Sequence, residues 1–326
     1  MKILITGAGS VMGQSIYKAL SKHCFDERVE IHFANSEILG AGRFFNCETA
    51  PVVAAPIFPI AKDPSYLPWL VRYVEENSID IVFTGTQHEL EKISAYRDET
   101  MRAATLPSRV TAICMDKIKT ERTLRHHGIR VPGTQSLDEY MESPAIDGPV
   151  IVKPNFSSSS RSISRFENHD DVSGAFSAKS EWNGDFLVQE RIAGDEYTCG
   201  CYLDRYSGTI NQICFRRTLT LDGATFYGEI VCDPDISAYV EKIAKSLQQE
   251  GLDFGHFNVQ LIIDEDGPCL FEINGRLSST EASKAHFGFN SCAAFVYNIV
   301  KETEYTHWSI ATSGKFLRYY DEVYFN

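Results

Sequence analysis

The 326-residue sequence lacks the features of several protein classes. Acidic residues outnumber basic ones, 44 Asp and Glu against 31 Lys and Arg, so the net charge is −13. This charge disfavours binding to nucleic acid or to an anionic membrane surface through bulk electrostatics, because those partners are also negative. No apolar run in the sequence approaches the roughly 20 residues that a helix needs to span a bilayer. We therefore expect neither a nucleic-acid partner nor a membrane partner.

A disulfide framework and a leader segment are also missing. The nine cysteines are irregularly spaced and odd in number, which argues against paired thiols. Cys199 and Cys201 have no second pair at zinc-like spacing, so alternate positions on one strand are the simpler interpretation. The chain begins with a strand pattern, Lys2 to Thr6, in place of a basic and apolar leader. We expect a reduced, cytoplasmic protein.

The chain length predicts two or three compact units. Its first hundred residues alternate apolar strand patterns with helical patterns, which predicts a parallel, doubly wound α/β sheet. The strand patterns there are 3–5, 31–34 and 79–84, and the helical patterns are 13–21 and 66–77. A helix is expected after Asp116, a suitable N-cap. Beyond it the patterns are mostly those of paired strands: 150–153, 186–189, 196–203, 209–216, 255–263, 268–274 and 316–320, with one helix at 236–249.

Glycines at positions 7, 9 and 13 mark a turn between a strand and a helix. Their spacing differs from G-x-G-x-x-G, and no clear acidic residue closes the next strand to hold a ribose. Backbone amides at the start of the helix could still attract an anion. A tight strand-to-helix turn is the favoured interpretation.

A lysine at the end of a buried strand, Lys153, is followed by a loop of small residues from Asn155 to Ser162. The loop contains Ser157, Ser158 and Ser159, whose amides and hydroxyls could close over anionic oxygens, and Arg161 adds a positive charge. A surface lysine before a flexible loop is the alternative.

The segment from Val188 to Glu196 is an extended link between two strand patterns. Its backbone could hydrogen-bond an adenine edge, and the carboxylates of Glu190 and Glu196 could bracket a ribose. A charged β-edge explains the same pattern without a ligand.

The most informative segment carries Gln260 on one strand and Glu272 and Asn274 on the next. Side chains alternate along a strand, so Glu272 and Asn274 share a face, and Gln260 can lie beside them. Oxygen ligands without sulfur or histidine suit Mg²⁺, which completes its shell with water and phosphate oxygens. Arg276 follows directly and could stabilise charge on a transferring phosphoryl group.

Together these segments resemble the ATP-grasp superfamily, in particular the carbamoyl-phosphate synthetase large subunit and its short single-module relatives. The most specific stretch runs from Asn258 through Ser279 to Ala282–Ala285. The resemblance implies an α/β chain, α+β in its ATP module: a Rossmann-like pre-ATP-grasp domain over 1–112 and an ATP-grasp domain over 113–326. A mobile lid subdomain is expected over about 131–189.

The resemblance also implies a role for each matching residue. Lys117 and Lys153 would contact the ATP phosphates, Ser157, Ser158 and Ser159 would belong to the lid, and Glu196 would bind the ribose. The adenine linker would include Glu190, Arg191 and Ile192. Gln260, Glu272 and Asn274 would ligate Mg²⁺, with Mn²⁺ as an alternative. Arg276 and Lys153 would be the catalytic residues, with Arg276 beside the acyl phosphate. Two positions depart from the family pattern: the lid is rich in serine where glycine is frequent, and Gly275 stands where proline is usual.

The implied reaction is an ATP-dependent carboxylate–amine ligation. The γ-phosphate of ATP would pass to a carboxylate, and an amine would capture the acyl phosphate to form an amide, with release of ADP and phosphate. Small-molecule carboxylates and amines are the expected partners, and a homodimer is an open expectation. Two alternatives remain: a carbamoyl-phosphate synthetase-like activity on bicarbonate, or a nucleotide- or NAD(P)-binding regulatory protein or oxidoreductase.

Four further residues are candidates for substrate contacts. Glu89 follows a strand end, where open α/β sheets bind ligands, although a carboxylate at a helix N-terminus is an equally good explanation. Arg217 follows Arg216, so one of the two should face the site. His256 and His286 lie near the last motif, but structural or exposed histidines are more common.

Overall fold

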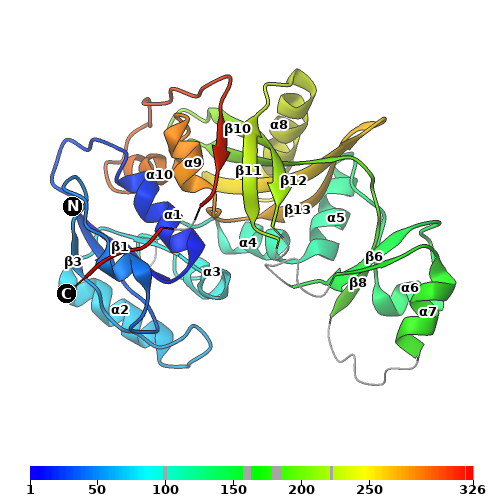
Figure 1. Cartoon of the computed structure of the whole chain (residues 1–326), viewed down its shortest axis with the longest axis horizontal. Coiled ribbons are helices and arrows are strands. Elements are labelled where there is room, and N and C mark those ends of the chain that lie inside the picture. Colours follow the sequence, from blue (N-terminus) through cyan, green and yellow to red (C-terminus); the bar gives the residue numbers. More distant parts are fainter. Residues whose placement is uncertain (98–100, 157–162, 178–184, 221–222, 320, 326) are drawn as a thin grey trace.

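The computed structural model describes residues 1–97, 101–156, 163–177, 185–220, 223–319 and 321–325. Within these ranges the chain forms three β-sheets with helices on their faces (Figure 1). A parallel sheet lies at the N-terminal end of the molecule, a six-stranded antiparallel sheet lies at its centre, and a small antiparallel sheet projects at the far side.

The N-terminal sheet has the parallel pairing that the strand–helix alternation predicts. Its strand order is β3-β2-β1-β4, and every pair in it is parallel. The strands are β1 Lys2–Ile5, β2 Glu30–Phe33, β3 Val52–Ala54 and β4 Ile81–Phe83. The helical elements are α1 Val11–Leu20, the 3₁₀ turn η1 Ala41–Phe44, α2 Tyr66–Asn77 and α3 Gln87–Ser94. The predicted bounds of α2 are confirmed, and β3 is a strand that the pattern missed.

Two short helices, α4 Ser108–Met115 and α5 Lys117–His126, carry the chain toward the central sheet. The side chain of Asp116 accepts a hydrogen bond from the Lys119 amide at 2.9 Å, which caps α5 as predicted.

The small sheet has the order β5-β8-β6-β7 and antiparallel pairing. Its strands are β5 Thr134–Ser136, β6 Val150–Pro154, β7 Ser164–Phe166 and β8 Phe186–Glu190. Helices α6 Leu137–Glu142 and α7 His169–Ser177 cover one face. The buried core between them contains Tyr140, Val150, Val152, Val172 and Val188.

The central sheet has the order β13-β12-β9-β10-β11-β14. Its strands are β9 Asp195–Leu203, β10 Ile210–Leu219, β11 Thr225–Ile230, β12 Gly255–Asp264, β13 Gly267–Asn274 and β14 Lys315–Leu317. Helix α8 Pro234–Gln249 packs on one face, in a core with α4 and α5. The other face packs on α10 Ser291–Ile299 and residues of α1, with α9 Glu281–His286 beside them. The final strand is shorter than the predicted 316–320.

Strand register places the predicted oxygen ligands together. Asp264 pairs with Gly267 across the predicted hairpin turn, and a register shift between Leu261 and Gln260 then brings Gln260 opposite Glu272 and Asn258 opposite Asn274. Opposite residues of an antiparallel pair point to the same face, which is therefore rich in amides and carboxylates. None of the helices in the described part of the chain has the length and apolarity that a bilayer crossing requires.

Candidate functional site

A cavity of about 390 Å³ lies between the small sheet and one face of the central sheet. Its walls come from β6, β7 and β8, from the link 191–194, and from β9, β10, β12 and β13. Most of the residues singled out in the sequence line it: Lys117, Lys153, Glu190, Arg191, Ile192, Glu196, Arg217, Gln260 and Glu272. Residues that are far apart in the sequence thus meet in one polar cavity.

Two lysine ammonium groups enter the cavity from neighbouring elements. Lys153 on β6 is 4% exposed, and its Nζ donates to Oε1 of Gln189 at 2.8 Å. The pKa of Lys153 is lowered to about 8, chiefly by burial; the Glu272 carboxylate opposes this shift and the nearby Lys117 ammonium adds to it. Lys117 begins α5, and its Nζ donates to the backbone oxygen of Asn155 at 2.9 Å. Burial also lowers the pKa of Lys117. An anionic ligand would relieve the cost of holding two positive charges here.

The link from Glu190 to Gly194 joins the two sheets and forms one edge of the cavity. Glu190 accepts a hydrogen bond from the Gly133 amide at 3.0 Å, and the Arg191 amide donates to the carbonyl of Pro149 at 2.9 Å. A Cβ at Gly194 would lie 2.1 Å from the backbone oxygen of Ile263, so the link follows β12 at a distance that only glycine permits. This edge of the cavity is therefore held in place by hydrogen bonds to neighbouring segments and by its close approach to β12.

The oxygen ligands predicted for a metal are close together, but two of them are engaged with protein groups. Nδ2 of Asn274 donates to Oε1 of Glu272 at 3.1 Å. Oε1 of Gln260 accepts a hydrogen bond from Nη2 of Arg217 at 3.0 Å, and the same nitrogen lies 3.1 Å from Oε2 of Glu196. No group of three or more His, Cys, Asp or Glu side chains suitable for a metal occurs among the described residues. One carboxylate and two amides suit Mg²⁺ held partly by nucleotide phosphates, because that ion needs few protein ligands.

The neighbouring arginines on β10 point to opposite faces, as the sequence predicts. The Arg217 side chain is 7% exposed and lines the cavity, whereas that of Arg216 is 50% exposed and pairs with Asp195 and Glu229 outside it. Of the two, Arg217 is therefore the arginine that faces the site, and its role as a substrate contact stays a prediction. Its guanidinium bridges Glu196 and Gln260 within the candidate nucleotide cavity.

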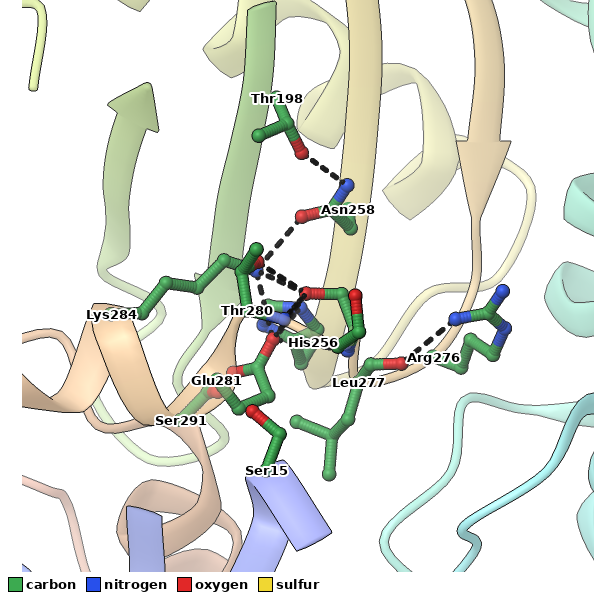
Figure 2. A network of polar contacts seen from close by, with 12 residues as sticks. Ser15, Thr198, His256, Asn258, Arg276, Leu277, Thr280, Glu281, Lys284 and Ser291 are labelled. Atoms are coloured by element: carbon green, nitrogen blue, oxygen red, sulfur yellow. Dashed lines mark hydrogen bonds and ion pairs between the residues drawn. The ribbon is translucent and has the colours of Figure 1, made fainter. Parts of the chain in front are cut away.

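Arg276 follows the end of β13, does not line the cavity and contacts Gln87 at the start of α3. Figure 2 shows its side chain beside the carbonyl of Leu277. Its guanidinium donates to Oε1 of Gln87 at 3.2 Å and to the backbone oxygen of Leu277 at 3.1 Å. Burial lowers the pKa of Arg276, opposed by Glu272 and Glu281. Arg276 therefore lies where the central sheet meets the start of α3.

The structure does not support Glu89 as a substrate contact. Its carboxylate is 3% exposed and accepts hydrogen bonds from the hydroxyls of Thr6 at 2.6 Å, Tyr66 at 3.0 Å and Thr86 at 2.9 Å. Together with Thr86 it forms the capping box of α3. The alternative left open by the sequence, a carboxylate at a helix N-terminus, describes this residue. Its pKa is raised by burial.

The glycine-rich turn before α1 packs closely against its neighbours. Gly7 has φ +65°, the Gly9 amide donates to Oδ1 of Asn35 at 3.1 Å, and Ser10 caps the helix through the Gly13 amide at 2.8 Å. Two of the amides that could attract an anion thus already have protein acceptors. This geometry matches the tight turn expected from the spacing.

The remaining candidates fall outside the cavity. Cys199 and Cys201 are buried free thiols on β9. His256 is 1% exposed inside the central sheet, where burial lowers its pKa to about 3, and His286 is exposed. The lid residues Ser157, Ser158, Ser159 and Arg161 lie outside the described residues.

The sequence analysis did not identify the apolar residues that line the cavity, nor the cation of Arg165. Ile151 shares a strand face with Lys153, and Ile262 shares one with Gln260, so the alternation rule could have identified both. Lys153 Nζ also lies 5.6 Å from the centre of the Phe271 ring. Arg165 on β7 lines the cavity as well, and no motif pointed to it.

A family model for the ATP-grasp domain matches residues 114–280, more than half of the chain. The chain belongs to the ATP-grasp family. This match confirms the resemblance inferred from the motifs around Gln260, Glu272 and Asn274.

Curated relatives include D-alanine–D-alanine ligases. The Bacillus anthracis protein is 23% identical over 183 residues, which cover 53% of this chain and 60% of that protein. D-alanine–D-alanine ligase A of Clostridium perfringens is 34% identical over 176 residues, covering 50% of this chain and 58% of that protein. The chain therefore matches less than two thirds of the length of these relatives.

Solved structures match over more of the chain. An L-amino acid ligase from Bacillus licheniformis has a TM-score of 0.70 at 16% identity, covering 92% of this chain and 74% of that one. A carboxyaminoimidazole ribonucleotide synthase from Aspergillus clavatus, complexed with ATP, has a TM-score of 0.72 at 13% identity, covering 97% and 81%. At these identities the likeness establishes the mixed α/β ATP-grasp fold.

Proposed function

We propose that this chain is an ATP-dependent carboxylate–amine ligase. The γ-phosphate of ATP is transferred to a carboxylate, and an amine attacks the resulting acyl phosphate, forming an amide with release of ADP and phosphate. The observation that carries the proposal is the single cavity in which the paired ammonium groups of Lys117 and Lys153 face Glu272. Such a cavity suits a polyphosphate accompanied by a divalent cation.

The nucleotide is placed by matching each part of it to the wall of suitable chemistry. The phosphates lie at Lys117 and Lys153, and the adenine lies along the link containing Glu190, Arg191 and Ile192. Apolar side chains in the lining, such as Ile151 and Ile262, give the base a surface to pack on. Glu196 binds the ribose, and Arg217 keeps Glu196 in place beside it.

Glu272, Asn274 and Gln260 hold Mg²⁺, with Mn²⁺ as an alternative. Of the three, Glu272 carries the charge, while Gln260 must first exchange its contact with Arg217 for the metal. A cation held there would neutralise charge on the phosphates. A solved biotin carboxylase domain of this fold, from a Hydrogenobacter thermophilus carboxylase, is described in complex with MgADP.

The substrates are assigned to the region around Arg276, between the central sheet and the N-terminal unit.

The chain is divided into a Rossmann-like pre-ATP-grasp domain at 1–112 and an ATP-grasp domain at 113–326. Residues 131–189, which include Ser157, Ser158 and Ser159, form a lid that excludes water from the acyl phosphate. Arg276 stabilises the charge that develops on the acyl phosphate, next to the amine. We propose that the protein is cytoplasmic and that its substrates are small molecules. Its proposed assembly is a homodimer.

The first experiment measures phosphate release with Mg·ATP across pairs of carboxylates and amines, beginning with amino acids because several relatives are amino-acid ligases. We expect release that requires both a carboxylate and an amine. The Glu272→Ala variant serves as the inactive control. Tight NAD(P) binding without ATP turnover, or full activity in Glu272→Ala, would overturn the proposal.

A further inference from the structure

A second polar cluster lies on the same face of the central sheet, beyond the nucleotide cavity (Figure 2). Unlike the cavity lining, its side chains are all buried: Thr198, His256, Asn258, Ser278, Thr280, Glu281, Lys284 and Ser291. They come from β9, β12, the loop after β13, α9 and the start of α10. None of the roles proposed for the nucleotide site uses them.

Lys284 is the centre of this cluster. Its ammonium group is fully buried and donates to Oδ1 of Asn258 at 2.8 Å, to Oγ of Ser278 at 3.0 Å and to Oε1 of Glu281 at 2.8 Å. Glu281 also receives the hydroxyl of Ser291 on its other oxygen at 2.6 Å. The buried charges therefore compensate each other within one ion pair.

β9 is shaped to let Lys284 cross it. A Cβ at Gly200 would lie 2.8 Å from Nζ, 2.9 Å from Cε and 3.0 Å from Cδ of Lys284. Any side chain at this strand position would displace the lysine. The site is thus built around the lysine stem as well as its charge.

The contacts of Lys284 connect two parts of the candidate site. Asn258 is paired in register with Asn274, and its Nδ2 donates to the hydroxyl of Thr198 at 2.9 Å. Ser278 follows Arg276 by two residues, and its amide donates to Oε1 of Glu281 at 3.0 Å. Lys284 therefore ties the loop that carries Arg276 to the strand beside the proposed metal ligands.

We propose that Lys284 is a positioning residue, which braces the loop 275–280 on β12 and so fixes Asn274 and Arg276 for Mg·nucleotide. This inference rests on the proposed function of the cavity. A lysine that served only to neutralise Glu281 would need neither the hydrogen bond to Asn258 nor a strand residue without a side chain at Gly200. Residues that orient metal ligands without touching the metal typically affect metal affinity or activity by about 10–100-fold.

The test compares ADP binding by calorimetry with MgCl₂ and with EDTA, which needs no knowledge of the substrates. Gly200→Ala displaces Lys284 without removing any polar group, and Lys284→Met combined with Glu281→Gln removes both charges together. Mg²⁺ should increase the affinity of the wild type for ADP. In both variants we expect this increase to be smaller by about tenfold or more. Their affinity for ADP in EDTA should stay within about threefold of the wild type, because the proposed lysine and adenine contacts are untouched.

Ser291→Ala is the matched control. It removes a buried hydrogen bond to Glu281 but leaves Lys284 bonded to Asn258 and Ser278. We expect it to lower the melting temperature and to keep the Mg²⁺ effect of the wild type.

The outcomes separate the two proposals. If the wild-type protein binds ADP neither with MgCl₂ nor with EDTA, the proposed function is wrong. If it binds ADP and the folded Gly200→Ala and double variants keep the full Mg²⁺ effect, the positioning role of Lys284 is wrong. Equal losses with Mg²⁺ and with EDTA would also overturn it, since they would indicate general damage to the cavity.

Discussion

Two buried lysines, Lys153 on the small sheet and Lys284 on α9, have different surroundings. Lys153, in the nucleotide cavity, has a neutral amide as its hydrogen-bond acceptor and a pKa lowered by burial to about 8. Lys284, in the buried cluster, has a carboxylate at 2.8 Å and two further acceptors. The comparison teaches that burial alone does not mark a ligand site. A buried cation that is hydrogen-bonded to a neutral amide is suited to bind an anion, whereas one held in an ion pair with a carboxylate is suited to hold structure.

The same substitution at both lysines should give the largest contrast. Lys284→Met leaves Glu281 buried without its cation, so we expect the free energy of unfolding to fall by about 3–5 kcal/mol. Lys153→Met removes a charge that burial already disfavours, so stability should stay within about 1 kcal/mol of the wild type. Urea unfolding followed by circular dichroism measures both. Equal losses of stability at the two positions would contradict the contrast.

Nucleotide binding should also depend on the carboxylate of Glu272. Glu272→Ala removes the charged ligand proposed for Mg²⁺, so we expect the Mg²⁺-dependent tightening of ADP binding to fall by about 100-fold or to be lost. Because Glu272 is partly exposed, the fold should be retained. Calorimetry with and without Mg²⁺ provides the measurement, and unchanged binding by a folded variant would remove the proposed metal site.

Strand parity explains how much of this site the sequence could predict. The spacing of Glu272 and Asn274 placed both on one face. Their register against Gln260 was not predictable from the turn at Asp264–Gly267, because it depends on a register shift between Gln260 and Leu261. The apolar run before Glu272 and the cap at Asp116 predicted local structure, because these signals are confined to a few adjacent residues.

Contacts between distant segments were not predictable in this way. Nothing local shows that Arg217 donates to Gln260, or that Tyr66 and Thr6 surround Glu89. Lys284 looks like an ordinary residue of a short helix until Gly200 and Asn258 are placed beneath it. Such partners depend on packing between elements, which a single sequence does not encode as a pattern.

The pH dependence of ADP binding should report on Lys153. Its ammonium form exists below its pKa of about 8, whereas an ordinary lysine with pKa 10.5 stays charged to higher pH. If only the ammonium form binds phosphate well, affinity should fall by about tenfold between roughly pH 7 and pH 9. Titrations in the wild type and in Lys153→Met measure this difference. A variant with the same pH profile as the wild type would assign the titration to another group.

The neighbouring arginines of β10 should give the smallest effect. Arg217→Ala removes the cation that bridges Glu196 and Gln260, so ADP affinity should fall by about fivefold, equivalent to about 1 kcal/mol. Arg216 is exposed on the opposite face, and Arg216→Ala should change affinity by less than about twofold. Parallel titrations of the two variants make the comparison, and a larger loss in Arg216→Ala would reverse the assigned faces.

A crystal structure of the chain with Mg·ADP tests the central claim most directly. The account predicts a nucleotide in the cavity between the two antiparallel sheets, with phosphates at Lys117 and Lys153 and a metal ion between them and Glu272. Nucleotide bound elsewhere, or phosphates turned away from both lysines with no metal at Glu272, would contradict it.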